Sequence, residues 1–280
     1  MGESVKIGNV EVLSLLDMIP PAYDPKEFMP LVPAEAWAPY RKEFLESDGK
    51  LQLYYGCFAL RLDSRVIMVD TGMGPGPHPT RGNRTGDLLN QMKQRGISPE
   101  DVDTVVHTHL HADHVGWNVT VAGGQPRPTF SRARYLFPRA DWEYYTRPEV
   151  LERSPWIKAS VVPLQGLGVV ELIEEERTVA PGVSTLSVPG HTPGHLVVII
   201  NSRGEKGVLM GDVFHSLVQI QEPNWCIRAD VDLDLSRRGR AALLDRMERE
   251  KMIVCAGHFA SGQTIGKVVK AGGRRRWQAL

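Results

Sequence analysis

The chain has 280 residues, which is long enough to bury a sizeable core in one large domain or two small ones. Hydrophobic residues make up 42% and charged residues 24%, as is typical of globular proteins that live in water. The 33 basic and 33 acidic residues leave a formal net charge of zero, so the composition favours neither a nucleic-acid partner nor an anionic membrane.

Two further classes are excluded by the residue pattern. No apolar stretch approaches the roughly 20 residues of a membrane span, and the N-terminus has acidic Glu3 where an export signal has basic and then apolar residues. We therefore expect a cytoplasmic protein without membrane contact. The cysteines are odd in number and widely spaced, which argues against a disulfide framework and against a cysteine-rich zinc site. We expect buried thiols at Cys57, Cys226 and Cys255.

The first sixty residues predict strands that are interrupted by one irregular segment. Val5 to Leu16 alternates as strands do, with a turn at Gly8-Asn9. Residues 18–50 are rich in proline and interrupt the pattern, and a long irregular segment in a compact domain usually serves a function. We predict that this excursion caps the site or forms a dimer contact. Residues 51–62 and 65–69 then predict a hairpin.

Helical and strand-like patterns interleave along the rest of the chain, which indicates an α/β (α+β) fold. Helices are predicted at residues 85–95, 139–146 and 235–250, and strands at residues 104–107, 133–137, 183–188, 195–201, 207–211 and 252–256.

Several apolar runs end abruptly at a polar residue. The polar residues at these positions are Asp70, His107, Asp212 and His258. Continuous apolar runs suit strands that are buried on both faces, and loops at the ends of such strands often carry function. The pattern therefore predicts sheets covered by helices, with polar side chains gathered along one edge.

The run from His109 to His114 reads His-Leu-His-Ala-Asp-His and is the strongest motif in the chain. Residues two apart in an extended segment project to the same side, so His109 and His111 can bind one metal ion together. If a helix begins near Asp113, this carboxylate and His114 point toward a second position. Imidazole and carboxylate ligands suit zinc, manganese, iron or cobalt. A cluster of surface histidines is the alternative interpretation.

Three later positions place a candidate ligand after a glycine. His191 follows Gly190, Asp212 follows Gly211 and His258 follows Gly257. Glycine lets the backbone approach a metal ion closely. Alone, each is more typical of a structural turn, but their order after the first motif favours further ligands.

In this order, the motifs resemble the metallo-β-lactamase superfamily across essentially the whole chain. The resemblance implies a four-layer αββα sandwich formed by one domain over residues 1–280. It also implies two divalent metal ions, zinc in the first place, with manganese, iron or cobalt as alternatives. The implied ligands are His109, His111 and His191 for the first ion and Asp113, His114 and His258 for the second, with Asp212 bridging and with Asp70 and His195 orienting the ligands.

Departures from the best-known branches narrow the activity that the resemblance implies. The best-known β-lactamases of the superfamily have cysteine where this chain has Asp212, which argues against a β-lactam substrate. The chain has no net charge and lacks the basic surface of the superfamily's nucleases. Only about twenty residues follow His258, where the similar thioesterases add a helical segment. The residues after Asp212 are similar to the branch that contains methyl parathion hydrolase and 4-pyridoxolactonase-like enzymes. Lactonases acting on homoserine lactones usually have tyrosine where this chain has His215, which argues against that substrate but not against lactone hydrolysis.

The expected function is hydrolysis of a small lactone or other carboxylic ester by a metal-bridging hydroxide, with a phosphotriester as the alternative substrate and a non-catalytic metal-binding protein as the alternative role. His215 is the candidate for donating a hydrogen bond or proton, and Asp113 for moving a proton. A homodimer is expected from the branch. Four aromatic residues next to the ligands in sequence are predicted to line an apolar substrate pocket, with core packing as the alternative: Trp117, Phe214, Trp225 and Phe259.

Overall fold

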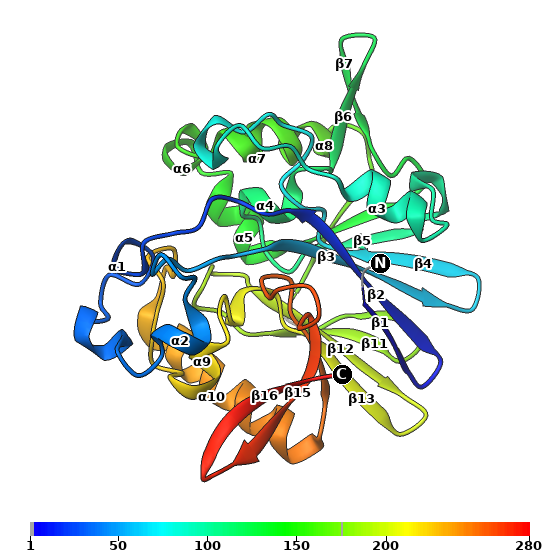
Figure 1. Cartoon of the computed structure of the whole chain (residues 1–280). Coiled ribbons are helices and arrows are strands. Elements are labelled where there is room, and N and C mark those ends of the chain that lie inside the picture. The colour runs from blue at the N-terminus through cyan, green and yellow to red at the C-terminus, as the bar shows by residue number, and fades with distance from the viewer. Residues whose placement is uncertain (1–2, 175) are drawn as a thin grey trace.

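The computed structural model describes residues 3–174 and 176–280, which form two seven-stranded sheets and the helices that cover them (Figure 1). The first sheet has the strand order β1-β2-β3-β4-β5-β8-β9. Its strands are β1 (Ser4–Ile7), β2 (Val10–Met18), β3 (Tyr55–Leu62), β4 (Arg65–Val69), β5 (Thr104–Val106), β8 (Arg134–Pro138) and β9 (Val170–Ile173).

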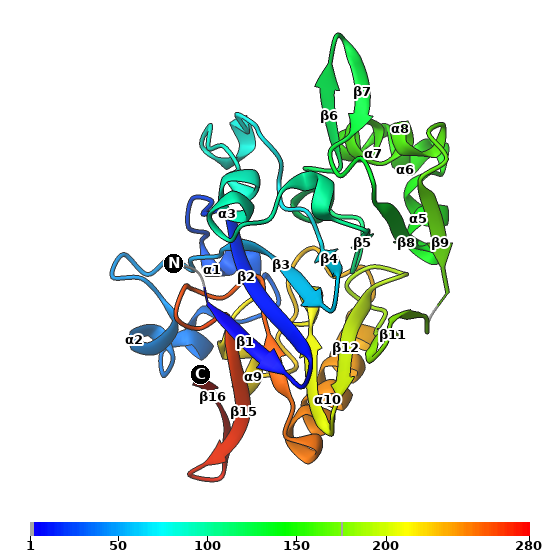
Figure 2. The same cartoon turned by 90° about the vertical axis from the view of Figure 1, so that its right-hand side faces the viewer.

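The second sheet is built from the C-terminal part of the chain and has the order β10-β11-β12-β13-β14-β15-β16. Its strands are β10 (Thr178–Ala180), β11 (Val183–Ser187), β12 (Leu196–Ser202), β13 (Glu205–Leu209), β14 (Ile253–Cys255), β15 (Ile265–Ala271) and β16 (Arg274–Ala279). A separate hairpin of β6 (Val119–Ala122) and β7 (Gln125–Pro128) projects from the body in both views (Figure 2).

Helices cover the outer face of each sheet. The first sheet carries α3 (Leu88–Gln94), α4 (Ala112–Val115), α5 (Arg139–Tyr145), α6 (Pro148–Glu152), α7 (Pro155–Ser160) and α8 (Val162–Gln165). The second sheet carries α9 (Val218–Gln221) and α10 (Leu233–Glu250). Short 3-10 turns lie at η1 (Ala34–Trp37), η2 (Pro79–Arg81), η3 (Pro99–Asp101) and η4 (Gly211–Val213).

Alternate residues of the central strands enter different cores, which explains their continuous apolar runs. In β12, Val198 and Ile200 face the core between the two sheets, whereas Val197 and Ile199 pack under α10. The order is therefore helices, sheet, sheet, helices, and the expected four-layer αββα sandwich is confirmed.

Strand direction brings the polar strand ends together. β4, β5, β8 and β9 run parallel, and β13 runs parallel to β14. Asp70 follows β4, His107 follows β5, Asp212 follows β13 in η4, and His258 follows β14 by three residues. Because parallel strands end at the same edge of their sheet, both sheets present candidate ligands at one rim.

The excursion at residues 18–50 contains α1 (Pro25–Phe28), η1 and α2 (Arg41–Phe44). Its apolar side chains form a separate small core together with residues of α9 and of the loop between α9 and α10. Phe28, Met29 and Trp37 are buried together with Val218 and Ile227. The segment is thus packed beside the rim that holds the polar strand ends (Figure 1).

Most expected elements are present, with small differences at their ends. The helix expected at residues 85–95 begins only at Leu88, because the buried carboxylate of Asp17 accepts hydrogen bonds from the N–H groups of Asp87 and Leu88. The β6–β7 hairpin and the short helices α6, α7 and α8 were not predicted. The three cysteines are free and buried, as expected. In the described part of the chain, no helix has the length and apolar character needed to cross a bilayer.

Candidate metal centre

The loop after β5 places four polar side chains in the order that the motif predicts. His111 lies on extended backbone, and α4 begins at Ala112, so Asp113 and His114 turn away on a helix. The carboxylate of Asp141, at the start of α5, accepts a hydrogen bond from the Leu110 N–H at 3.0 Å. This bond fixes the middle of the motif against the neighbouring helix.

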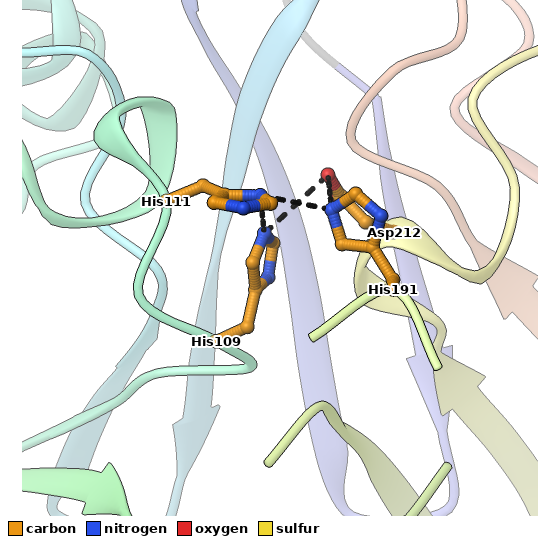
Figure 3. Close-up of side chains that lie close together, drawn as sticks. All are labelled: His109, His111, His191 and Asp212. Atoms are coloured by element: carbon orange, nitrogen blue, oxygen red, sulfur yellow. Dashed lines mark hydrogen bonds and ion pairs between the residues drawn. The ribbon is translucent and has the colours of Figure 1, made fainter. Parts of the chain in front are cut away.

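One group of four side chains brings its donor atoms within 4.8 Å of one another: His109, His111, His191 and Asp212 (Figure 3). His111 Nδ1 lies 3.1 Å from His109 Nε2 and 2.9 Å from His191 Nε2. Asp212 Oδ2 lies 3.3 Å from His191 Nε2. Side chains more than 100 positions apart in sequence therefore point at one small volume.

A second group lies on the other side of Asp212 and consists of Asp113, His114 and His258. Asp212 Oδ1 is 3.2 Å from His114 Nε2 and 3.0 Å from His258 Nε2. The two oxygens of one carboxylate therefore face two different donor groups. This is the arrangement that a ligand shared by two ions requires.

The donor atoms fit divalent metal ions. His114 Nε2, His258 Nε2 and Asp212 Oδ1 are buried and have no hydrogen-bond partner in the described chain, although buried polar atoms are normally satisfied. The nitrogen atoms of His109, His111 and His191 that face one another lie close together, and a cation between them would stabilise this arrangement. Nitrogen and oxygen donors without thiolate suit zinc, manganese, iron or cobalt.

Outer partners hold the rings in the ligand orientation. Asp70 Oδ2 lies 2.9 Å from His114 Nδ1 and also accepts from the Thr108 hydroxyl, which lies 3.0 Å from His109 Nδ1. Asp230 Oδ1 lies 2.9 Å from His191 Nδ1. Each ring with an acceptor at Nδ1 keeps its proton there and leaves Nε2 free for a metal ion.

His258 is held in the same way by a backbone group, since its Nδ1 lies 2.7 Å from the Tyr54 carbonyl oxygen. His195 is not itself a candidate ligand, but it orients Asp212, because its Nε2 accepts a hydrogen bond from the Asp212 N–H at 2.9 Å. Gly211 precedes Asp212 with φ of 50°, and a Cβ there would lie 2.6 Å from His195 Nε2. Only glycine fits this turn.

Burial and the buried carboxylates act in opposite directions on the ligand histidines. Burial alone would lower the pKa of His114, His191 and His258, but the neighbouring carboxylates outweigh it and raise the pKa of these three rings. Burial lowers the pKa of His109 and of His111 well below its usual value, which keeps both imidazoles in the form that binds metal. Burial alone would raise the pKa of Asp230, but the hydrogen bond and charge of His191 lower it to about 2. Burial likewise opposes ionisation of Asp212, whose pKa the surrounding histidines hold well below its usual range.

His215 lies against the bridging position. Its Nε2 is 3.0 Å from Asp212 Oδ2, and its ring stacks on His258 with centroids 5.0 Å apart. Burial lowers the pKa of His215 to about 4, so the ring is neutral at pH 7. A neutral ring can donate one hydrogen bond to a molecule that binds beside the candidate ligands. Of the two roles expected of His215, this supports the donation of a hydrogen bond rather than of a proton.

The predicted pocket aromatics require correction, because none of the four lines the cavity above the donor groups. Trp117 donates Nε1–H to Asp17 and Phe214 packs in the core under α10. Trp225 packs on Trp37 and Tyr40. Phe259 contacts Trp277 and lines a neighbouring cavity instead. Proximity in sequence to a ligand does not set the direction of a side chain, and these rings turn to apolar cores.

The cavity wall comes from other parts of the chain. Its aromatic residues are Tyr23, Phe28, Tyr55 and Trp156, and Arg81 and Arg228 are its cationic residues. Tyr23 and Phe28 belong to residues 18–50, the segment that was predicted to cap the site or form a dimer contact. Sequence reasoning missed the other four, together with the outer partners Asp141 and Asp230. In the sequence, Asp230 is one of three aspartates at alternate positions. Nothing in the pattern indicates that Asp230, rather than Asp232 or Asp234, contacts a candidate ligand.

Comparison with known proteins agrees with this geometry. A sequence model described as the metallo-beta-lactamase superfamily matches residues 56–258. The N-acyl homoserine lactonase AiiA of Bacillus thuringiensis subsp. kurstaki is 27% identical over 229 residues, which cover 76% of this chain and 84% of that protein. Residues 56–258, which the family model matches, include every residue of the two donor groups.

Two solved structures share the fold over their whole length. The hydrolase AbOPH of the beta lactamase superfamily superposes with a TM-score of 0.86 at 23% identity, covering 100% of this chain and 97% of that one. The dizinc quorum-quenching lactonase AidC, in complex with a product, superposes with a TM-score of 0.83 at 20% identity and the same coverage.

Proposed function

The chain belongs to the metallo-β-lactamase superfamily and is a metal-dependent hydrolase, and we propose that it opens a small lactone or another carboxylic ester at the two donor groups. The observation that carries this proposal is the placement of Asp212, whose two oxygens face separate sets of buried nitrogen donors. The relative with the homoserine lactonase name supports ester chemistry at such a site.

We infer that His109, His111 and His191 hold one divalent ion, that Asp113, His114 and His258 hold the other, and that Asp212 is shared. Zinc is the first candidate, since a structural neighbour is described as a dizinc enzyme. When bound, a pair of divalent ions activates water at neutral pH and polarises the ester carbonyl. A homodimer and a cytoplasmic location remain predictions from the sequence.

The chain's own residues orient the ester and move the proton in this proposal. Asp113 is the most exposed of the acidic donors, with 17% of its side chain accessible, and it lines the cavity. Its free oxygen can take a proton released from water and return it to the leaving alkoxide. His215 donates its N–H to the negative charge that develops on the reacting carbonyl oxygen.

The test combines metal analysis with a substrate panel. The purified protein should contain about two equivalents of divalent metal. Asp212→Ala should lose metal and lower kcat/KM by more than about 100-fold, because it removes a ligand rather than an outer partner. Asp234→Ala is the matched control, since Asp234 is an exposed carboxylate whose one ion pair among the described residues is with Arg237.

The panel contains a lactone, an aryl ester, a phosphotriester and a chromogenic β-lactam. Turnover of the lactone or aryl ester supports the proposal. Full activity in a metal-free preparation, or turnover of the β-lactam alone, would contradict it.

A further inference from the structure

The cavity wall carries an arginine that is held firmly in place. Arg81 ends η2 and donates its Nε–H to the Tyr55 hydroxyl at 2.9 Å. The Tyr55 hydroxyl also lies 2.8 Å from that of Tyr23, and the Tyr55 ring packs edge-on against His258 at 5.8 Å. Arg81 is thereby connected through one buried tyrosine to the donor group that contains His258.

Arg81 has no carboxylate partner within the described residues. Its Nη1 bonds to the carbonyl oxygen and hydroxyl of Thr80, and its Nη2 forms no hydrogen bond within those residues. Arg240, a buried arginine, differs from Arg81 in this respect. Arg240 is paired with Asp230 and donates to three backbone carbonyl oxygens. A guanidinium left with free donors on a cavity wall can bind a ligand.

The charges around the cavity favour an anion. Asp113 and Asp212 are its only acidic lining residues in the described chain, and both are assigned to the metal ions. Two divalent ions carry more positive charge than two carboxylates neutralise. Arg228 adds a second cation on the exposed side of the cavity, and it has no ion pair among the described residues. A cavity lined by one sign of charge concentrates ligands of the opposite sign.

We propose that Arg81 binds a carboxylate carried by the substrate, so that the preferred substrate is an ester or lactone with an acidic substituent. This inference rests on the proposed function and names its substrate class. The Nη2 of the guanidinium keeps its N–H donors for a carboxylate, and the planar group fixes the direction of these donors, which a flexible ammonium group does not. Tyr55 holds the guanidinium at a fixed place relative to the donor groups, so the carboxylate positions the ester carbonyl.

Two aryl esters that differ only at the chain end test the proposal. The neutral substrate is 4-nitrophenyl hexanoate, and the anionic one is the mono-4-nitrophenyl ester of adipic acid. The wild-type, metal-loaded protein should have the higher kcat/KM for the adipate ester, with the preference decreasing as salt is added. Arg81→Met should reduce the ratio of the two kcat/KM values by about 10-fold or more, mainly through KM, because a hydrogen bond to a charged group is lost.

Two further variants separate binding from a loss of structure. Arg81→Lys keeps the charge but loses the Nη2 donors and their fixed direction, so it should restore only part of the ratio. Arg127→Met is the control on the exposed β6–β7 hairpin and should leave both esters and the metal content unchanged.

The possible results distinguish the anion site from the proposed function. Turnover of both esters with the same ratio in wild type and Arg81→Met would overturn the anion site and leave the proposed function standing. Turnover of neither ester by the metal-loaded protein would overturn both. A lower ratio in Arg81→Met with two equivalents of metal retained supports both.

Discussion

The two sheets supply the candidate ligands in different ways. The first sheet contributes four of them from one loop, between His109 and His114, whereas the second contributes three from three separate loops at His191, Asp212 and His258. The first set is placed by local backbone geometry, an extended turn followed by α4. The second set depends on the packing of β11, β13 and β14, so its geometry is only as stable as the sheet that carries it.

The supports of the two sets differ accordingly. Asp70 holds the first set from inside the same sheet, because it bonds to both Thr108 and His114. Asp230 holds His191 from a loop outside the second sheet and is itself paired with Arg240 of α10, whose Nη2 lies 3.6 Å from Asp230 Oδ2. The ligands from the second sheet therefore depend on a longer series of buried contacts than the ligands from the first sheet.

The largest expected effect comes from breaking that series of contacts at Arg240. Arg240→Met leaves Asp230 as a buried charge without its cation and removes donors from three backbone carbonyl oxygens. We expect the free energy of unfolding to decrease by about 3–5 kcal/mol, measured by urea denaturation of the metal-free protein. The control is Arg237→Met, one helical turn away and partly exposed, which should change it by less than about 1 kcal/mol. Equal effects of the two variants would refute the special role of Arg240.

A pair of conservative variants sharpens the comparison at the level of metal binding. Asp230→Asn should weaken the ion held by His191, and Asp70→Asn mainly the ion held by His114, each by about 10–100-fold in affinity. Chelator competition with spectroscopic detection of each site measures the two losses separately. If both variants weakened the same ion, the two sets would not be supported independently.

The smallest effect is expected beside the contiguous motif, on the projecting hairpin. Val121 of β6 is 74% exposed, and β6 and β7 pair only with each other in the described structure. Val121→Thr should change the free energy of unfolding by no more than about 0.5 kcal/mol and leave the metal content unchanged. A larger loss would mean that the motif also depends on the hairpin that follows it.

The same difference decides how much the sequence could predict. The contiguous motif and the apolar runs that end at Asp70, Asp212 and His258 are local patterns, so sheets covered by helices and a metal site at one edge could be predicted from them. The four layers and the full set of ligands were implied by the family resemblance. The partners of those ligands could not be predicted, because Asp141 and Asp230 meet them only through tertiary packing. Arg81 and Tyr55 reach the cavity from segments whose sequences contain no motif.

The prediction of the pocket aromatics was wrong for a related reason. Phe214 is two residues from Asp212, yet its side chain enters the core under α10. The backbone conformation of η4, which places Asp212 outside helical geometry, sets these opposite directions. Such a turn cannot be inferred from residue identity alone.

The two oxygens of Asp212 are not equally satisfied by the chain itself. Oδ1 is buried and has no hydrogen-bond partner among the described residues, whereas Oδ2 lies 3.0 Å from His215 Nε2. Because a buried oxygen without a partner carries a desolvation penalty, a metal ion at the group of Asp113, His114 and His258 would remove a larger penalty than an ion at the other group. We therefore expect a metal titration to fill the group of Asp113, His114 and His258 first.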